Sequence, residues 1–124
     1  MKLKELSNPL PSFFENFKQF LQKKVRNEFV YSSDQSIHVY ARKGIHLING
    51  KQEQTLDIAR IEVDDALQGR GIGTAMINGI HDLNPFKITY VENLLNEQLY
   101  ARLKKQGWLD VNNSLPPCVY KSKE

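Results

Sequence analysis

The chain begins with an apolar pattern of helical period. Apolar side chains recur at intervals of three and four residues, and lysine and arginine fill the other face; the apolar set is Phe13, Phe14, Phe17, Phe20, Leu21, Val25 and Phe29. This spacing predicts an amphipathic helix over 13–29. Pro11 and Ser12 stand at its start, where proline is tolerated in a first turn and serine is a good cap.

The pattern then changes to short runs rich in β-branched and aromatic residues. The runs are 29–33, 36–42, 44–50 and 55–63, separated by turn-forming residues. They predict a strand meander whose last strand is the longest. Helical spacing returns at 74–83 and 94–106, with strands expected within 86–92 and 116–122. The order of elements, α, a β meander, then α-β-α-β, predicts a mixed α/β (α+β) fold.

Length and charge narrow the class of protein. The 124 residues fit a single domain, 1–124, with a loose lead-in over 1–9. The net charge of +3 suits an anionic ligand but does not indicate nucleic acid by itself. The N-terminus lacks the features of a signal peptide, and no apolar run approaches membrane-spanning length. We therefore expect a cytoplasmic protein with no membrane contact.

Cysteine and histidine are too sparse to predict a metal centre. Cys118 is the only cysteine, which excludes an intrachain disulfide and leaves it as a packing thiol. His38, His46 and His81 do not stand at metal-ligand spacing from one another. We expect no metal cofactor.

A glycine-rich segment, QGRGIG at 68–73, joins the longest strand to the next helix. Such a turn leaves the first N–H groups of the helix unpaired, and the helix dipole adds positive charge there. The result is an anion site suited to phosphate, which glycine allows to come close. No Gly-Lys-Ser/Thr follows, and Thr74 and Met76 stand where a dinucleotide fingerprint needs its third glycine. An ordinary tight turn would need only one glycine.

The segment 68–73 resembles the Q/R-x-x-G-x-G/A loop of the GNAT N-acetyltransferase superfamily, which binds the pyrophosphate of acetyl-coenzyme A. The strand 56–63 ends where that family's fourth strand ends, and 96–108 is similar to its second signature. The two signatures follow the family's order, whereas residues 1–50 carry none of its motifs. The resemblance implies a GNAT-like fold: a mixed, mostly antiparallel, twisted sheet flanked by helices, with splayed central strands.

The resemblance also implies acetyl-coenzyme A (acetyl-CoA) as co-substrate. The residues implied to contact it are Ile61, Val63, Gln68, Gly69, Arg70, Gly71, Ile72, Gly73, Thr74 and Asn96. Thr74 would offer its hydroxyl to a phosphate oxygen, and Asn96 would either bond the pantetheine arm or hold its helix. Lys104 and Lys105 would meet the 3′-phosphate or form a solvated helix face.

Acetyl transfer to an amine requires a group that removes a proton, because a lysine-type amine has a pKa near ~10.4. Asp57 stands where some family members carry a glutamate base, and Glu62 lies near the end of the same strand. Strand alternation places them on opposite faces unless a bulge intervenes, and the family carries a bulge nearby. Each carboxylate is otherwise a solvated group paired with Arg60 or a lysine. His38 and His46 are alternative bases.

The leaving thiolate is usually protonated by a tyrosine in the family's last helix, but Leu103 occupies that position here. Tyr100 stands one helical turn earlier and could act as the acid from a shifted register, or it is a half-buried packing residue. Without an acid the thiolate could still leave into water, at a cost in rate.

The predicted function is an N-acyltransferase that transfers an acetyl group from acetyl-CoA to a primary amine by direct attack in a ternary complex. The alternative is a weak or inactive GNAT-like module that binds acyl-CoA or a protein partner, as Leu103 suggests. A nucleic-acid binder using the basic face of the first helix is a third hypothesis. The acceptor is an amine-bearing small molecule, a protein or an RNA. The short N-terminal region favours a large acceptor, or a homodimer that completes the site.

Overall fold

The computed structural model describes residues 8–111 and 114–123, so most of the predicted lead-in, 1–9, lies outside the described residues. The elements are α1 (Leu10–Gln22), β1 (Asn27–Tyr31), β2 (Ile37–Ile48), β3 (Lys51–Val63), the 3-10 helix η2 (Asp65–Leu67), α2 (Ile72–Leu83), β4 (Ile88–Val91), α3 (Glu97–Lys105), β5 (Leu109–Asp110) and β6 (Val119–Ser122). The strands form one sheet in the order β1-β2-β3-β4-β6-β5. Among the described strands, β3 and β4 are the one parallel pair, which confirms the predicted mixed, mostly antiparallel sheet.

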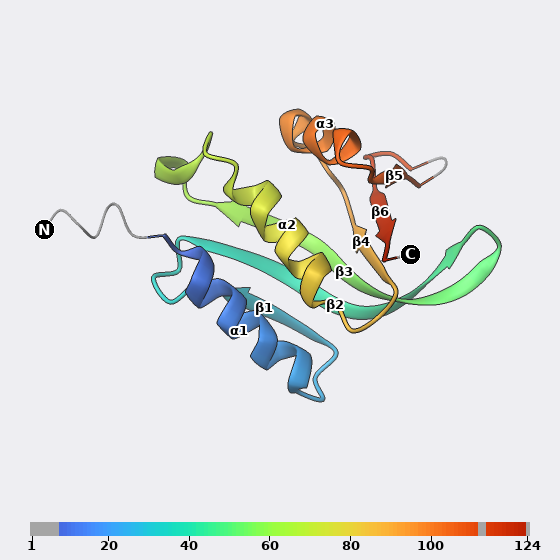
Figure 1. The fold of residues 1–124 in the computed structure, drawn as a ribbon, viewed down its shortest axis with the longest axis horizontal. Helices are drawn as coiled ribbons and strands as arrows, with labels where there is room; N and C mark the ends of the chain where they lie inside the picture. Colours follow the sequence, from blue (N-terminus) through green and yellow to red (C-terminus); the bar gives the residue numbers. More distant parts are fainter. Residues whose placement is uncertain (1–7, 112–113, 124) are drawn as a thin grey trace, which may run out of the picture.

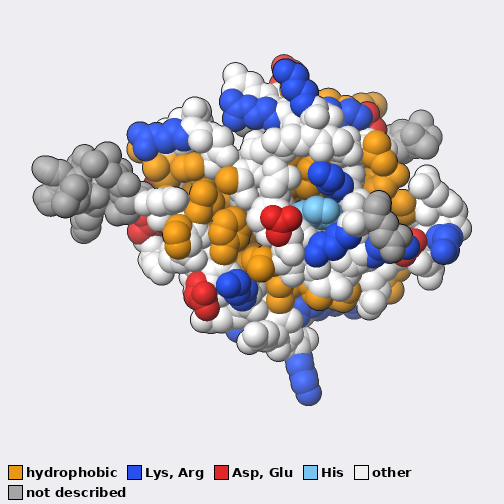
Figure 2. Space-filling view, viewed as in Figure 1, with side chains coloured by type: hydrophobic (Ala, Val, Ile, Leu, Met, Phe, Trp, Pro, Cys, Tyr) orange, Lys and Arg blue, Asp and Glu red, His pale blue; other side chains and the backbone are white. Residues whose placement is uncertain are grey.

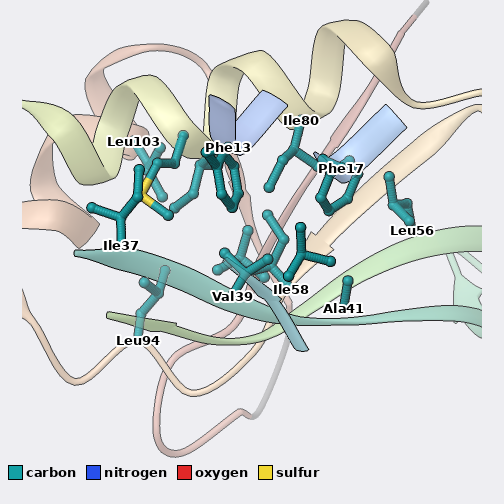
Figure 3. Packing of buried hydrophobic residues seen from close by; sticks show 14 of the residues in the cluster. Phe13, Phe17, Ile37, Val39, Ala41, Leu56, Ile58, Ile80, Leu94 and Leu103 are labelled. Atoms are coloured by element: carbon teal, nitrogen blue, oxygen red, sulfur yellow. The ribbon is translucent and has the colours of Figure 1, made fainter. Parts of the chain in front are cut away.

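The main core lies between the sheet and the helices packed on one of its faces. Figure 1 shows α1 and α2 side by side across the strands, with α3 at the end of the molecule that carries β5. In Figure 3, side chains from the helices meet side chains from the strands; the cluster includes Phe13, Phe17, Ile37, Val39, Ala41, Leu56, Ile58, Ile80, Leu94 and Leu103. Fully burying one such large side chain contributes about 1.5–3 kcal/mol, so this face holds the sheet and helices together.

The first helix is shorter than predicted and begins earlier. It covers Leu10–Gln22, with Pro11 in its first turn, and Lys23 is already extended. Ser12 therefore lies inside the helix instead of capping it. Phe29, predicted on the helical stripe, belongs to β1 and is 48% exposed. The helical pattern fails here because Phe29 pairs with β2. The strand hydrogen bonds stabilise this conformation although the exposed Phe29 side chain gains little from burial.

The predicted break at 42–44 is wrong, because β2 runs without interruption from Ile37 to Ile48. The turn comes later, at Asn49 and Gly50, whose φ angles of 50° and 81° are those of a two-residue hairpin turn. Gly44 has a different reason to be glycine. A Cβ there would lie 2.5 Å from Oδ2 of Asp57 on the neighbouring strand.

The two central strands part halfway along β3, which confirms the predicted splay. The pairing of β3 with β4 ends at Ile58 and Val91, and the N–H of Glu92 makes a last bond to the carbonyl of Ile58 at 3.0 Å. Beyond that point β3 continues to Val63 on its β2 side only. At the same place a bulge adds one residue to β3, because Tyr40 faces Arg60 while Ala41 faces Ile58.

The basic side chains on the face shown in Figure 2 are spread out and do not form one patch. Figure 2 shows apolar side chains over the α1 and α2 region and basic side chains scattered around it. The basic run beyond α1 is also partly neutralised, since Lys23 pairs with Glu28 at 3.0 Å. These observations do not favour the nucleic-acid hypothesis based on the first helix. In the described part of the chain, no helix has both the length and the apolar character needed to cross a bilayer.

The contact between α1 and α2 depends on a missing side chain. A Cβ at Gly79 would lie 2.2 Å from Cζ of Phe14. We expect Gly79→Leu to lower the free energy of unfolding by about 1–3 kcal/mol through overpacking. In a Phe14→Ala background the same change should be stabilising, because leucine fills the vacated space and favours the helix more than glycine. Urea unfolding of the four proteins measures both effects; the same sign in both backgrounds would contradict this contact.

Candidate functional site

The loop between β3 and α2 leaves the start of the helix open. Gly69 and Gly71 have φ angles of 82° and 77°, and Gly71 is the N-cap of α2, so the cap residue offers no side chain to the helix end. Gln68 closes the loop from within, because its Nε2 donates to the carbonyl of Val63 at 3.1 Å. The first backbone N–H groups of α2 therefore have no partner in the helix and carry the positive end of its dipole.

A pocket of about 380 Å³ lies between the free end of β3, the glycine loop, α2 and α3. Its lining comprises Ile61, Glu62, Val63, Leu67, Gln68, Gly69, Gly71, Ile72, Gly73, Thr74, Asn96, Gln98, Leu99 and Arg102. Every residue that the sequence predicted to contact the cofactor is in this set except Arg70. The folding of the chain thus brings two segments nearly thirty residues apart, 68–74 and 96–102, into the lining of one pocket.

One polar atom in the pocket wall has no partner. The Oγ1 of Thr74 is buried and accepts or donates no hydrogen bond within the described part of the chain. Leaving a buried hydroxyl unsatisfied costs about 1–3 kcal/mol. Together with the open helix end, this atom indicates a site for a ligand that supplies hydrogen-bonding oxygens.

Helix α3 contributes residues that the sequence reasoning missed. Arg102 lines the pocket, and its Nη1 would be 3.9 Å from a Cβ at Gly71. Leu99 and Arg102 are three residues apart on a helix, so the helical spacing predicted at 94–106 could have identified the arginine as the neighbour of Leu99. Asn96 caps the helix, because its Oδ1 accepts from the N–H of Leu99 at 3.0 Å. That favours the second of the two roles considered for Asn96, holding its helix.

The bulge in β3 decides how the two predicted bases are arranged. Asp57 pairs with Arg42 of β2, and Glu62 pairs with His38 of β2. Arg42 and His38 are four residues apart on β2, so their side chains lie on the same face. Both acids therefore lie on the same face of the sheet, opposite the helices. Glu62 is exposed, and hydrogen bonds from Arg60 lower its pKa. It is a weak base in this setting.

Asp57, in contrast, is buried in a polar cluster. Its side chain is 2% exposed, accepts from Oγ1 of Thr55 at 2.6 Å, and lies 3.0 Å from Nε2 of His46. Nε of Arg42 is 3.6 Å from the same carboxylate oxygen, and Arg42 also bonds Glu92. The acid is thus surrounded by groups that stabilise its negative charge.

The cluster has the composition of a metal site but the charges of an ion-pair network. Ligand atoms of His46, Asp57 and Glu92 lie within 4.8 Å of one another. The guanidinium of Arg42 contacts both carboxylates and places a permanent positive charge among them. A cation would have to displace that charge, so the arrangement fits an ion-pair network better. Sequence reasoning missed the grouping because its members come from β2, β3 and the segment after β4.

The predicted acid is not brought to the pocket. The hydroxyl of Tyr100 donates to Oδ1 of Asp110 at 2.6 Å, and this hydrogen bond raises the tyrosine pKa. Tyr100 lines a different hollow, shared with Cys118. Leu103 is fully buried in the core. Lys104 binds Asp110 at 2.8 Å, so it is engaged away from the pocket.

The remaining candidate base, His38, belongs to an exposed aromatic group on β1 and β2. Its ring lies 4.7 Å from Tyr31 and 5.9 Å from Phe29. Burial lowers its pKa, and no cofactor-pocket residue other than its cross-strand neighbour Glu62 adjoins it in the sheet register.

Comparison with known proteins gives a fold but no sequence family. No family model and no curated protein sequence matches the chain. Among solved structures, a mutant of the toxin AtaT bound to the C-terminus of the antitoxin AtaR matches with a TM-score of 0.57 and 16% identity. The match covers 71% of this chain and 59% of the AtaT chain, so it spans less than two thirds of that protein. AtaT complexed with acetyl-methionyl-tRNAfMet matches with a TM-score of 0.59 and 14% identity. That match covers 87% of this chain and 76% of the AtaT chain.

Two acetyltransferases from other sources agree. A Bacillus subtilis acetyltransferase in complex with CoA has a TM-score of 0.56 and 13% identity, covering 80% of this chain and 78% of that one. Arabidopsis thaliana Naa50, in complex with the bisubstrate analogue CoA-Ac-MVNAL, has a TM-score of 0.52 and 16% identity over 94% and 95%. The chain has the GNAT acetyltransferase fold. Within this GNAT fold, the loop 68–73 and its pocket lie beside the part of β3 that no longer pairs with β4.

The orphan hydroxyl of Thr74 can be tested without any ligand. We expect Thr74→Val to raise the free energy of unfolding by about 1 kcal/mol, because it removes a buried polar atom that has no partner. Thr74→Ser keeps the hydroxyl and should bring no such gain. Chemical denaturation compares the three proteins. A clear loss of stability in Thr74→Val would show that the hydroxyl is satisfied within the folded chain.

Proposed function

We propose that this protein is an N-acetyltransferase that takes its acetyl group from acetyl-CoA and transfers it to a primary amine by direct attack in a ternary complex. One observation carries the proposal: the pocket at the α2 N-terminus is lined by the glycine loop and by a buried hydroxyl without a partner. The structural neighbours, which include acetyltransferases solved with CoA or a CoA-derived analogue, support it.

The pocket fits the pyrophosphate of the cofactor by its chemistry. Open N–H groups at the start of α2, the hydroxyl of Thr74 and the guanidinium of Arg102 all donate hydrogen bonds, and each charge-assisted bond contributes about 1.5–3 kcal/mol. Beyond Ile58 no described strand pairs with the edge of β3 that faces away from β2, which leaves its backbone groups available to a pantetheine arm. A backbone N–H there would polarise the thioester carbonyl.

We further propose that the acceptor amine belongs to a large molecule, a protein or an RNA. The helix α1 is the only described helix before the sheet, so little of the described chain builds an acceptor wall. The neighbours include one complex with a bisubstrate analogue that contains a peptide and one with an acetylated aminoacyl-tRNA, which supports an acceptor of this size. A small-molecule amine, a homodimer and a cytoplasmic location stay predictions from the sequence.

A binding module without catalysis is the second candidate, and the last helix favours it. Leu103 is buried, and the hydroxyl of Tyr100 is held by Asp110 outside the pocket. No described side chain of α3 then offers a phenol to the leaving thiolate. Such a protein would bind acyl-CoA but would transfer the acyl group slowly or not at all, so little free coenzyme A would form.

Two measurements on the wild-type chain separate these functions. Calorimetry with CoA tests binding, and saturating ligand at about 100 times its Kd should add about 2.7 kcal/mol to the free energy of unfolding. Release of free thiol is then followed with acetyl-CoA and a panel: spermidine, a lysine peptide, a peptide with a free N-terminus and an aminoacyl-tRNA. Binding with turnover supports the enzyme; binding without turnover on any acceptor favours the module. Absence of binding would refute both.

Gly73→Ala tests the pocket itself. A Cβ at Gly73 would be 3.9 Å from the methyl groups of Leu99, an ordinary contact, so the free protein should be as stable as wild type or slightly more stable. The same methyl occupies space beside the open helix end, and we expect it to weaken CoA binding at least tenfold. Asp82→Ala, at the other end of α2, is the control and should bind normally. Equal affinity in Gly73→Ala would contradict a cofactor in this pocket.

A further inference from the structure

The polar cluster around Asp57 is built by a close approach of two strands. Asp57 on β3 leans over Gly44 on β2, where a Cβ would lie only 2.5 Å from Oδ2. The carboxylate can therefore reach His46, which is not its cross-strand partner in the register. Its other oxygen is held by Thr55 at 2.6 Å. Any residue larger than glycine at position 44 would close this route.

His46 is held in one orientation by two contacts. Its Nε2 lies 3.0 Å from Oδ2 of Asp57, and its ring stacks on Tyr90 with centroids 3.7 Å apart and planes 7° apart. Because a carboxylate only accepts, it favours the tautomer with the proton on Nε2. Nδ1 is then left with a lone pair. The side chain of His46 is 25% exposed, so it can be reached from solvent.

The cluster stands at the point where β3 and β4 part. Asp57 and Tyr90 are register partners, and the pairing of these strands ends one residue later at Ile58 and Val91. Glu92, whose carboxylate is 3.9 Å from His46, directly follows β4. The cluster lies on the sheet face opposite the helices, so an acceptor could approach there while the cofactor occupies the helix side of the splay.

We propose that His46 is the general base of the acetyl transfer and that Asp57, the acid predicted to be the base, is instead a positioning residue that orients the imidazole. This inference rests on the proposed function. Asp57 is buried and has its oxygens engaged, so it is poorly placed to meet an acceptor directly. His46 is partly exposed and oriented, and no described residue bonds its Nδ1.

The step balances with the groups already named. The acceptor ammonium, R–NH3+, gives one proton to Nδ1 of His46, and the neutral amine attacks the thioester carbonyl. A C–N bond forms, the C–S bond breaks, and the thiolate of coenzyme A leaves. The attacking nitrogen loses its second proton, which neutralises the thiolate directly or through water. The products are the N-acetyl amide, coenzyme A and imidazolium, which returns its proton to solvent.

The charges that face His46 come from β2, β3 and the segment after β4. Asp57 and the cross-strand neighbour Glu53 lie on β3, Arg42 lies on β2, and Glu92 follows β4. Tyr90, beneath the ring, stays neutral over the working range because burial raises its pKa to about 12. Because several ionisable groups surround His46, a pH profile of the wild-type protein is compared with the profile of a His46 variant.

The kinetic test uses His46→Gln with the acceptor that wild type acetylates. We expect kcat to fall about 100-fold near neutral pH, a typical contribution of a general base, with CoA affinity unchanged within twofold. The defect should shrink as the pH approaches the pKa of the acceptor amine, because the base is then no longer needed. Added imidazole should partly rescue a His46→Ala variant. A loss of less than twofold, or a loss equal at every pH, would overturn the assignment.

A second measurement does not depend on turnover. Nitrogen-15 NMR of the imidazole should show a single Nε2–H tautomer in wild type. Asp57→Asn should give a mixture of tautomers, and Gly44→Ala, which keeps the acid but displaces it, should do the same. A mixture in wild type, or no response to either variant, would overturn the role of Asp57. If CoA fails to bind wild type, the proposed function fails; if CoA binds and these results are absent, only the present inference fails.

Discussion

The separation of β3 from β4 after Ile58 is the constraint on which the rest of the structure depends. Two paired parallel strands satisfy one another's backbone groups, whereas strands that part leave those groups to be satisfied by something else. The bulge at the same position turns β3 locally and ends the pairing. Both the pocket at the α2 N-terminus and the cluster at Asp57 lie along this opening. A sheet in which β3 stayed paired with β4 to Val63 would have no room for the pocket.

The two sides of the opening solve different electrostatic problems. On the helix side, the start of α2 carries positive partial charge, and the guanidinium of Arg102 lines the pocket with no ion pair to a described carboxylate. On the opposite side, the buried carboxylate of Asp57 is surrounded by Arg42, His46 and Thr55. The first environment attracts an anion, and the second stabilises an anion that the protein already carries. In the proposed reaction, the first environment would bind the anionic cofactor and the second would orient the base.

In α3, the side chains that line the pocket are not the ones that the sequence predicted to act in catalysis. Its register keeps Leu99 and Arg102 at the pocket, while Leu103 packs in the core and Tyr100 turns to Asp110. Helical geometry allows only one of these faces to meet the ligand. If the protein is an enzyme, the thiolate leaves without a phenol from this helix, and the burden of catalysis shifts to deprotonation of the amine.

The sequence by itself determined the features that depend on near neighbours in the chain. The glycine loop, the amphipathic stripe of Phe13, Phe17 and Phe20, and the long last strand of the meander are all set by local spacing, and the structure has them. The end of α1, the continuity of β2 through Gly44 and the common face of Asp57 and Glu62 were decided only in the folded sheet. Each of these depends on strand register, and a single bulge reverses which side chains share a face. Local periodicity carries no record of that register, so the meeting of His46, Asp57 and Glu92 from three separate segments could be seen only in three dimensions.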